Sequence, residues 1–147
     1  MADIKVTALS EESTPISTDI VMLVDDPGGS AASKKLQLAN LSKGLALNIG
    51  ASTATTYTFA ITDSNNFIRF NNASTQTITI PPNSSVAFST GTRIWCMRQG
   101  AGAVTLAAGA GVTIWSVDSN LNISDRYGVV LLVKLTANTW NLSGDLS

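Results

Sequence analysis

Short apolar runs separated by turn residues dominate this chain from Thr55 onward, and no stretch shows the 3.6-residue period of a long helix. The spacing predicts strands at 56–61, 67–70, 77–80, 93–99, 104–106, 112–115 and 127–135. The last run is the longest, and we expect it to be a central strand that a turn at Ala137–Asn138 joins to a return strand. Closely spaced strands of this kind predict an all-β domain, either an antiparallel β-sandwich or a partly closed barrel.

The first 47 residues have a different pattern. A polar stretch is followed by the apolar run 20–24, a turn at 25–30 and an alternating run at 35–38. These runs predict an extended N-terminal arm that contains a short β-hairpin. Residues 40–47 are expected to form one or two helical turns, and residues 50–54 a linker. The sequence therefore divides into an attachment arm, 1–47, and an antiparallel β-domain, 48–147.

Charge is sparse and unevenly placed. Charged residues make up 13% of the 147 residues, against about 25% in ordinary globular domains. The net charge is −1 without a basic cluster, so we expect neither nucleic acid nor a membrane as a partner. The N-terminal segment 1–26 carries a single basic residue, Lys5, and the acidic residues Asp3, Glu11, Glu12, Asp19, Asp25 and Asp26. This asymmetry supports a separate role for the arm. With no signal-like start and no long apolar window, synthesis in the host cytoplasm is expected.

Two glycine-containing stretches raise the possibility of a nucleotide site. In the stretch GAGAVTLAAGAGVTIW, Gly100 and Gly102 fit a dinucleotide fingerprint, but Thr105 stands where the third glycine belongs. The alternation that follows predicts a strand rather than a helix. The segment 28–34 has Ser33 in place of the glycine that precedes the lysine of a phosphate loop. Both stretches are therefore interpreted as turns.

Catalytic and metal-binding chemistry is poorly represented. The chain has no histidine, and its one cysteine, Cys96, lies in an apolar run where we expect it to be buried. A zinc site is excluded on these counts, and the segment 63–66 offers too few ligands for a calcium loop. The carboxylates available for an acid–base pair all lie beside turn residues; they are Asp63, Asp118, Asp125 and Asp145. We expect no enzymatic activity, no metal and no cofactor.

The three tryptophans, Trp95, Trp115 and Trp140, lie in predicted strands. Packing in the core or at a subunit contact is the favoured interpretation. The alternative is that one or more of them stack on sugar rings.

Two segments resemble proteins of tailed-bacteriophage virions. Residues 7–41 are similar to the N-terminal module of many such proteins, and their sequence is TALSEESTPISTDIVMLVDDPGGSAASKKLQLANL. A β-module of tail fibres and other virion surface proteins resembles residues 78–116 and 136–146, with the sequences ITIPPNSSVAFSTGTRIWCMRQGAGAVTLAAGAGVTIWS and TANTWNLSGDL. The resemblance implies a homo-oligomeric virion part. The absence of a shaft or collagen-like repeat favours a compact capsid cement (decoration) protein over a fibre.

The expected function is therefore a non-enzymatic protein on the virion surface that binds and stabilises the assembled capsid lattice. Its partner would be the major capsid protein or another virion protein. The alternative is a short tail fibre or receptor-binding protein that contacts host glycan. The residues expected to attach the arm to the capsid are Ile20, Met22, Asp25, Asp26, Lys34, Lys35, Leu36 and Leu38.

Self-association is expected because the run Val129–Val133 is apolar at successive positions, so both faces of that strand need cover. A homo-oligomer is predicted, with a trimer favoured over a dimer. Trp140 and Leu142 are expected near the contact.

Overall fold

The computed structural model describes residues 20–25, 32–37 and 47–147. The chain divides into two compact units, Met1–Ala46 and Leu47–Ser147. In the first unit, β1 (Ile20–Asp25) and β2 (Ala32–Gln37) pair antiparallel, with Met22 opposite Lys35. The helical turns expected at 40–47 lie outside the described residues, except for Leu47, which is in no helix.

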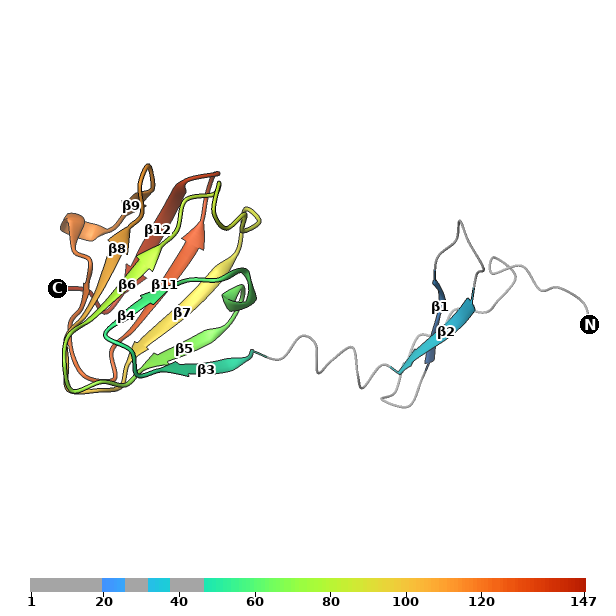
Figure 1. Cartoon of the computed structure of the whole chain (residues 1–147), viewed down its shortest axis with the longest axis horizontal. Helices are drawn as coiled ribbons and strands as arrows, with labels where there is room; N and C mark the ends of the chain where they lie inside the picture. Colours follow the sequence, from blue (N-terminus) through green and yellow to red (C-terminus); the bar gives the residue numbers. More distant parts are fainter. Residues whose placement is uncertain (1–19, 26–31, 38–46) are drawn as a thin grey trace, which may run out of the picture. The chain divides into compact units, whose positions relative to one another are not determined.

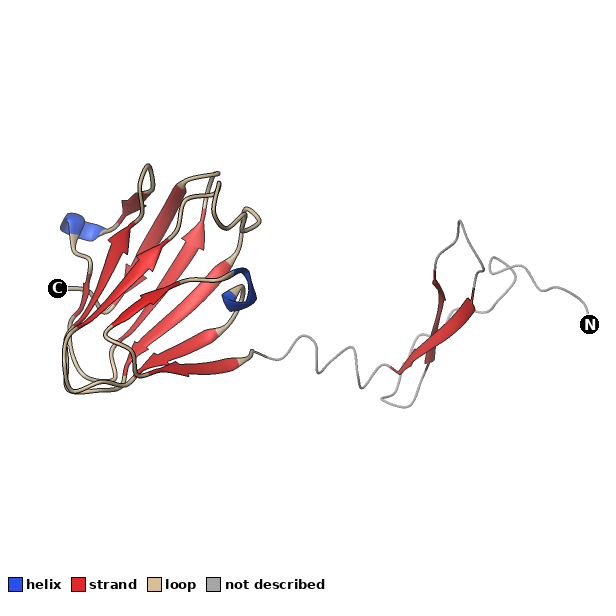
Figure 2. Ribbon diagram, viewed as in Figure 1, coloured by secondary structure: helices blue, strands red, loops and turns tan. Residues whose placement is uncertain are grey.

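The second unit is an all-β domain with two mixed sheets (Figures 1 and 2). The six-stranded sheet has the order β3-β5-β7-β11-β12-β9, and the four-stranded sheet the order β10-β8-β6-β4. The strand bounds are β3 Ile49–Ser52, β4 Thr56–Thr58, β5 Phe67–Phe70, β6 Gln76–Ile80, β7 Arg93–Arg98, β8 Val104–Ala108, β9 Thr113–Trp115, β10 Asn122–Ile123, β11 Val129–Lys134 and β12 Thr139–Gly144. Short 3₁₀ turns follow β4 and β9, at Ile61–Asp63 and Val117–Ser119.

The direction of strand pairing corrects the antiparallel sheets that the sequence predicted. From β3 to β8 the chain alternates between the two sheets, and each strand pairs parallel with the strand two places later. We call β3 to β8 the parallel winding. A chain that changes sheet at every corner returns to the first sheet running in its original direction. Parallel neighbours therefore follow from the winding, and hydrophobic alternation cannot reveal this because it is the same for both directions.

The corners of the winding stack on one another, and this accounts for the glycines at 100 and 102. Gly102 N donates a hydrogen bond to Asn72 O at 2.9 Å, and Asn71 N donates one to Ser52 O at 2.9 Å. A Cβ added at Gly100 would lie 2.1 Å from Asn72 O. The strand β8 follows directly, where a nucleotide fingerprint requires a helix. These glycines allow two backbone segments to approach closely.

Antiparallel strands complete the end of the domain beyond the winding. Here β11 pairs with β7 and with β12, and the β11–β12 hairpin turns at the predicted Ala137–Asn138. The short strand β10 pairs with β8, whereas β9 pairs parallel with β12. The sequence did not indicate β10, and the linker expected at residues 50–54 is wrong because Ile49–Ser52 is a strand.

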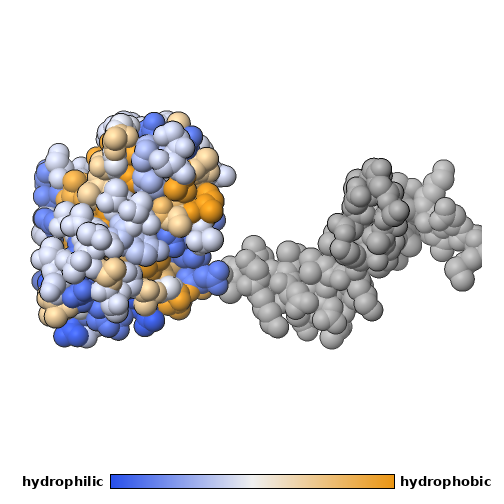
Figure 3. Space-filling model, in the orientation of Figure 1, coloured by the Kyte–Doolittle hydropathy of each residue, from blue (hydrophilic) through white to orange (hydrophobic). Residues whose placement is uncertain are grey.

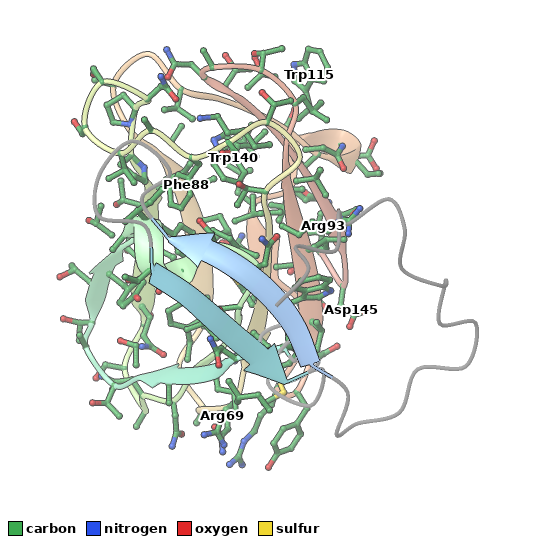
Figure 4. The ribbon with its side chains drawn as sticks, turned by 90° about the vertical axis from the view of Figure 1, so that its right-hand side faces the viewer. Arg69, Phe88, Arg93, Trp115, Trp140 and Asp145 are labelled. Carbon is green, nitrogen blue, oxygen red and sulfur yellow. The ribbon has the colours of Figure 1, made fainter. Side chains whose placement is uncertain are left out.

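One hydrophobic core is shared by the two sheets. Its buried residues are Phe59, Ile68, Phe70, Ile78, Ile80, Phe88, Ile94, Cys96, Val104, Leu106, Ile123, Val130, Leu132, Trp140 and Leu142. Trp140 lies edge-on to Phe88, with ring centroids 5.4 Å apart, and Figure 4 shows the two rings near each other. The expected burial of Cys96 is confirmed. Because the side chains of Trp140 and Leu142 are about 1% exposed, they are part of this core and are not available to a second copy.

Candidate interaction surface

The six-stranded sheet has an outer face that is mostly apolar. Along β7 and β11 the buried residues alternate with half-buried ones, so the half-buried residues lie on the side away from the core. The strand register places Phe67 opposite Trp95, and Trp95 opposite Leu131. We call this side of the sheet the outer face. Its residues are Ile49, Ala51, Phe67, Arg69, Arg93, Trp95, Met97, Thr113, Trp115, Val129, Leu131, Val133, Thr139, Asn141 and Ser143.

The middle of the outer face is a contiguous apolar surface. Val129 lies opposite Met97 in the row on one side of Trp95 and Leu131, and Val133 lies in the row on the other side. Cross-strand neighbours on one face have Cβ atoms about 4.5–5.5 Å apart, so these side chains are in reach of one another. Contiguous apolar surface of this kind is typical of interaction sites.

Two large hydrophobic side chains extend the outer face to the two edges of the sheet. Ile49 on β3 is 67% exposed, and Trp115 on β9 is 58% exposed. Trp115 lies opposite Asn141 in the register, so an aromatic ring and an amide share this edge. Figure 4 shows Trp115 and Arg69 toward opposite ends of the domain.

The charges on the outer face are both positive. Arg69 on β5 and Arg93 on β7 are its two ionisable residues, and Arg93 lies opposite Val133. Asp145 follows β12 and accepts a hydrogen bond from Val129 N at 2.9 Å, so it lies beside the outer face. On the side of the domain that Figure 3 shows, hydrophobic residues are interspersed with hydrophilic ones. A surface with few charges suits close contact with another protein surface.

Within residues 47–147 the one buried carboxylate is Asp63, and its hydrogen bonds are structural. Tyr57 Oη donates to both carboxylate oxygens of Asp63, at 3.0 and 2.9 Å, and Ala60 N donates at 2.8 Å. Burial, the hydrogen bond to Asp63 and its charge raise the pKa of Tyr57 to about 12. Burial, together with the charge of Asp63, also raises the pKa of the Cys96 thiol, so this cysteine is a poor nucleophile. The arrangement fixes the turn after β4.

Lys134 is a buried lysine, and it holds a loop in place. Its Nζ donates hydrogen bonds to Asn83 Oδ1 at 2.6 Å and to Phe88 O at 2.8 Å. It also lies 5.8 Å from the centroid of the Trp140 ring. Burial lowers the pKa of Lys134. Because the loop 81–92 supplies both acceptors, Lys134 ties this loop to the β11–β12 hairpin.

The other sequence candidates are dispersed. Asp118, Asp125 and Asp145 are exposed, and within residues 20–25, 32–37 and 47–147 no group of three His, Cys, Asp or Glu side chains could hold a metal ion. No helix among the described residues is long and apolar enough to cross a membrane.

Most of the expected attachment residues lie on the two strands of the first unit. Met22 is opposite Lys35, and Asp25 is opposite Ala32. Ile20, Lys34 and Leu36 also lie in the β1–β2 pair, whereas Asp26 and Leu38 lie outside the described residues. Their attachment role stays a prediction.

Sequence reasoning missed several residues of the outer face. The signal was present in β7, because residues 94–97 are apolar at successive positions in the same way as Val129–Val133. Such a run predicts a strand with two apolar faces, and the two strands are neighbours in the sheet. Ile49 was missed because its segment was interpreted as part of a linker region.

Comparison with protein-family models, curated proteins and solved structures gives no match to this chain.

Proposed function

We propose that this chain is a non-enzymatic structural protein of a bacteriophage virion, and specifically a capsid cement protein on the virion surface. The observation that supports it best is the apolar outer face, on which Phe67, Trp95 and Leu131 form a row across three strands. A domain with few charges and an apolar outer face is suited to contact with other proteins in an assembly. The resemblance of residues 7–41 and 78–116 to modules of virion proteins supports a virion as that assembly.

In this proposal the two units have different roles. The β1–β2 unit attaches to the major capsid protein or another virion protein, and the second unit is a β-sandwich that faces outward as a homo-oligomer. A protein that binds the assembled lattice and not its dissociated subunits shifts the equilibrium away from disassembly. The stabilisation grows with the concentration of the free protein relative to its dissociation constant, and it needs no catalysed reaction.

A short tail fibre or receptor-binding protein is the second candidate. It is favoured by one observation, the exposed ring of Trp115 beside Asn141 on β9 and β12. An exposed aromatic ring next to an amide can stack on a sugar and donate hydrogen bonds to its hydroxyl groups.

The test uses capsids of the phage that encodes the chain, prepared without this protein. Added protein should co-sediment with the capsids, saturate at a fixed stoichiometry and raise the temperature at which they release DNA. Binding to tails or to host cells, with none to capsids, would contradict the cement role and support the second candidate. Binding to neither would contradict both.

A further inference from the structure

The parallel winding is open at its first turn. The edge strands β3 and β4 end the two sheet orders at this end of the winding, and the corner 53–55 joins them. Figure 1 shows β3 at the margin of the six-stranded sheet. We call β3, β4 and this corner the open end. At the other end of the sheets the edge strands are β9, of three residues, and β10, of two.

The backbone of the open end has hydrogen-bonding groups directed away from the domain. Asn48 O accepts a bond from Phe67 N and Ser52 O accepts one from Asn71 N, so the intervening residues Ile49 and Ala51 direct their backbone groups to the free side. The same alternation applies to β4. Thr55 O accepts from Thr77 N and Phe59 N donates to Thr79 O, which leaves Thr56 and Thr58 on the free side.

Nothing in the sequence of the open end blocks strand addition. Residues 47–62 contain no charged residue and no proline, which are the usual protections of an exposed edge. Three large hydrophobic residues in this stretch are exposed, namely Leu47, Ile49 and Ile61, at 44%, 67% and 54%. An exposed edge of this composition favours pairing with another strand.

We propose that the open end pairs with the open end of a second copy across a twofold axis perpendicular to the sheets. A single added peptide could complete the edge of one sheet. Completing both needs two strands with the spacing and corner of β3 and β4, and the same end of a second copy has them by construction. A twofold axis makes each strand antiparallel to its own copy and uses the same surface on both partners. The lack of charge matters here, because an identical copy brings identical charges, which would repel.

This inference names a contact for the homo-oligomer of the proposed function, and it selects an even number of chains. The trimer favoured from the sequence has an odd number. If a threefold contact also exists on another surface, the free protein would be a hexamer. The mass of the free protein does not involve the virion, so this inference and the cement role can fail separately.

The experiment compares the mass of the full-length protein with that of two matched variants by light scattering at micromolar concentration. The edge variant is Ala51→Lys with Thr58→Lys. The control is Ala137→Lys with Thr136→Lys at the exposed hairpin turn, which makes the same exchanges and adds the same charge. The wild type and the control should contain the same even number of chains, and the edge variant half that number, because lysines of two copies would lie close together.

A third variant, Ala51→Pro, separates pairing from charge. It removes an N–H that is directed to the free side, so no bond to β5 is lost, and it should also halve the mass. Circular dichroism confirms that each variant is folded. A monomeric wild type, an odd number of chains, halving by the control as well, or folded edge variants with the wild-type mass would each overturn the inference.

Discussion

The amide of Gly102 donates a hydrogen bond to the carbonyl oxygen of Asn72 at 2.9 Å, and this bond joins two stacked corners of the parallel winding. A Cβ at position 102 would lie 1.9 Å from Ser74 O, and the opposing atoms are backbone atoms that cannot move independently. The corners are thus in contact without side chains between them.

Gly102→Ala should therefore destabilise the domain by about 3 kcal/mol or more, since overpacking against backbone forces the two corners apart. Urea denaturation of the purified protein measures the change. Gly50→Ala is the control, because its Cβ would meet only Ile68 Cγ1 at 3.8 Å, an ordinary contact. We expect a change below about 1 kcal/mol there. Equal effects of the two substitutions would contradict the stacked corners.

Tyr57 should titrate with a pKa of about 12. The Tyr127→Phe variant makes Tyr57 the single tyrosine, so tyrosinate absorbance at alkaline pH reports on it alone. Asp63→Asn in this background should lower the pKa of Tyr57, because it removes a negative charge and a strong acceptor. An unchanged titration in the Asp63→Asn variant would contradict the geometry of the pair.

The raised pKa of Tyr57 also predicts a pH dependence of stability. The pKa of Tyr57 is about 12 in the folded protein and 10.0 for an ordinary tyrosine, so the unfolded chain loses the proton first. The contribution of Tyr57 to the free energy of unfolding is fully present below pH 10 and is lost as the pH rises from 10 to about 12. The difference in unfolding free energy between the wild type and the Tyr57→Phe variant should shrink over this pH range. A difference that stays constant with pH would be inconsistent with the shift.

Lys134→Met should lower stability by about 1–3 kcal/mol at neutral pH, because Asn83 Oδ1 and Phe88 O lose their donor inside the protein. The sign of the pH effect is opposite to that of Tyr57. Since burial lowers the pKa of Lys134, the unfolded chain keeps its proton to higher pH than the folded chain. The contribution of Lys134 to stability should rise as the pH increases from the lowered pKa toward 10.5. Denaturant titrations of both proteins between pH 7 and about 10.5 test this, and a flat difference would contradict it.

Replacing Trp140 should lower the stability much more than replacing Trp115. Trp140→Ala should cost about 3–5 kcal/mol because it empties part of the core, whereas Trp115→Ala should cost less than about 1 kcal/mol. Iodide should quench the fluorescence of the wild type in part, and Trp115→Phe should remove most of the quenchable fraction. If the second candidate function holds, Trp115→Ala also abolishes binding to host glycan while leaving the fold intact.

Removing residues 1–46 should leave a folded domain that no longer joins the particle. The domain 47–147 has its own core, so its thermal unfolding should stay cooperative. Addition of the truncated and the full-length protein to the same capsids measures incorporation. Full occupancy by the truncated protein would show that the attachment role belongs to the β-domain.

Hydrophobic alternation predicted most strands of the β-domain correctly, because a period of two directly records which side chains face the core. Strands such as Phe67–Phe70 and Gln76–Ile80 follow from it, as does the hairpin at Ala137–Asn138. The apolar run Val129–Val133 also predicted a strand that is apolar on both faces of the sheet. Gly100 and Gly102 were correctly interpreted as turn residues, since the pattern after them is that of a strand.

The pairing partners and their directions came from the tertiary structure alone. Alternation identifies a buried face, but it contains no information on which strand lies beside which, and so the parallel winding was not foreseen. The same lack of information on pairing explains why Trp140 and Leu142, which were expected near a subunit contact, are instead buried in the core. Pairing with β11 places Trp140 opposite the buried Lys134 and Leu142 opposite the buried Leu132, so this register directs both side chains to the core. Thr139, Asn141 and Ser143 are the residues of that strand left on the outer face.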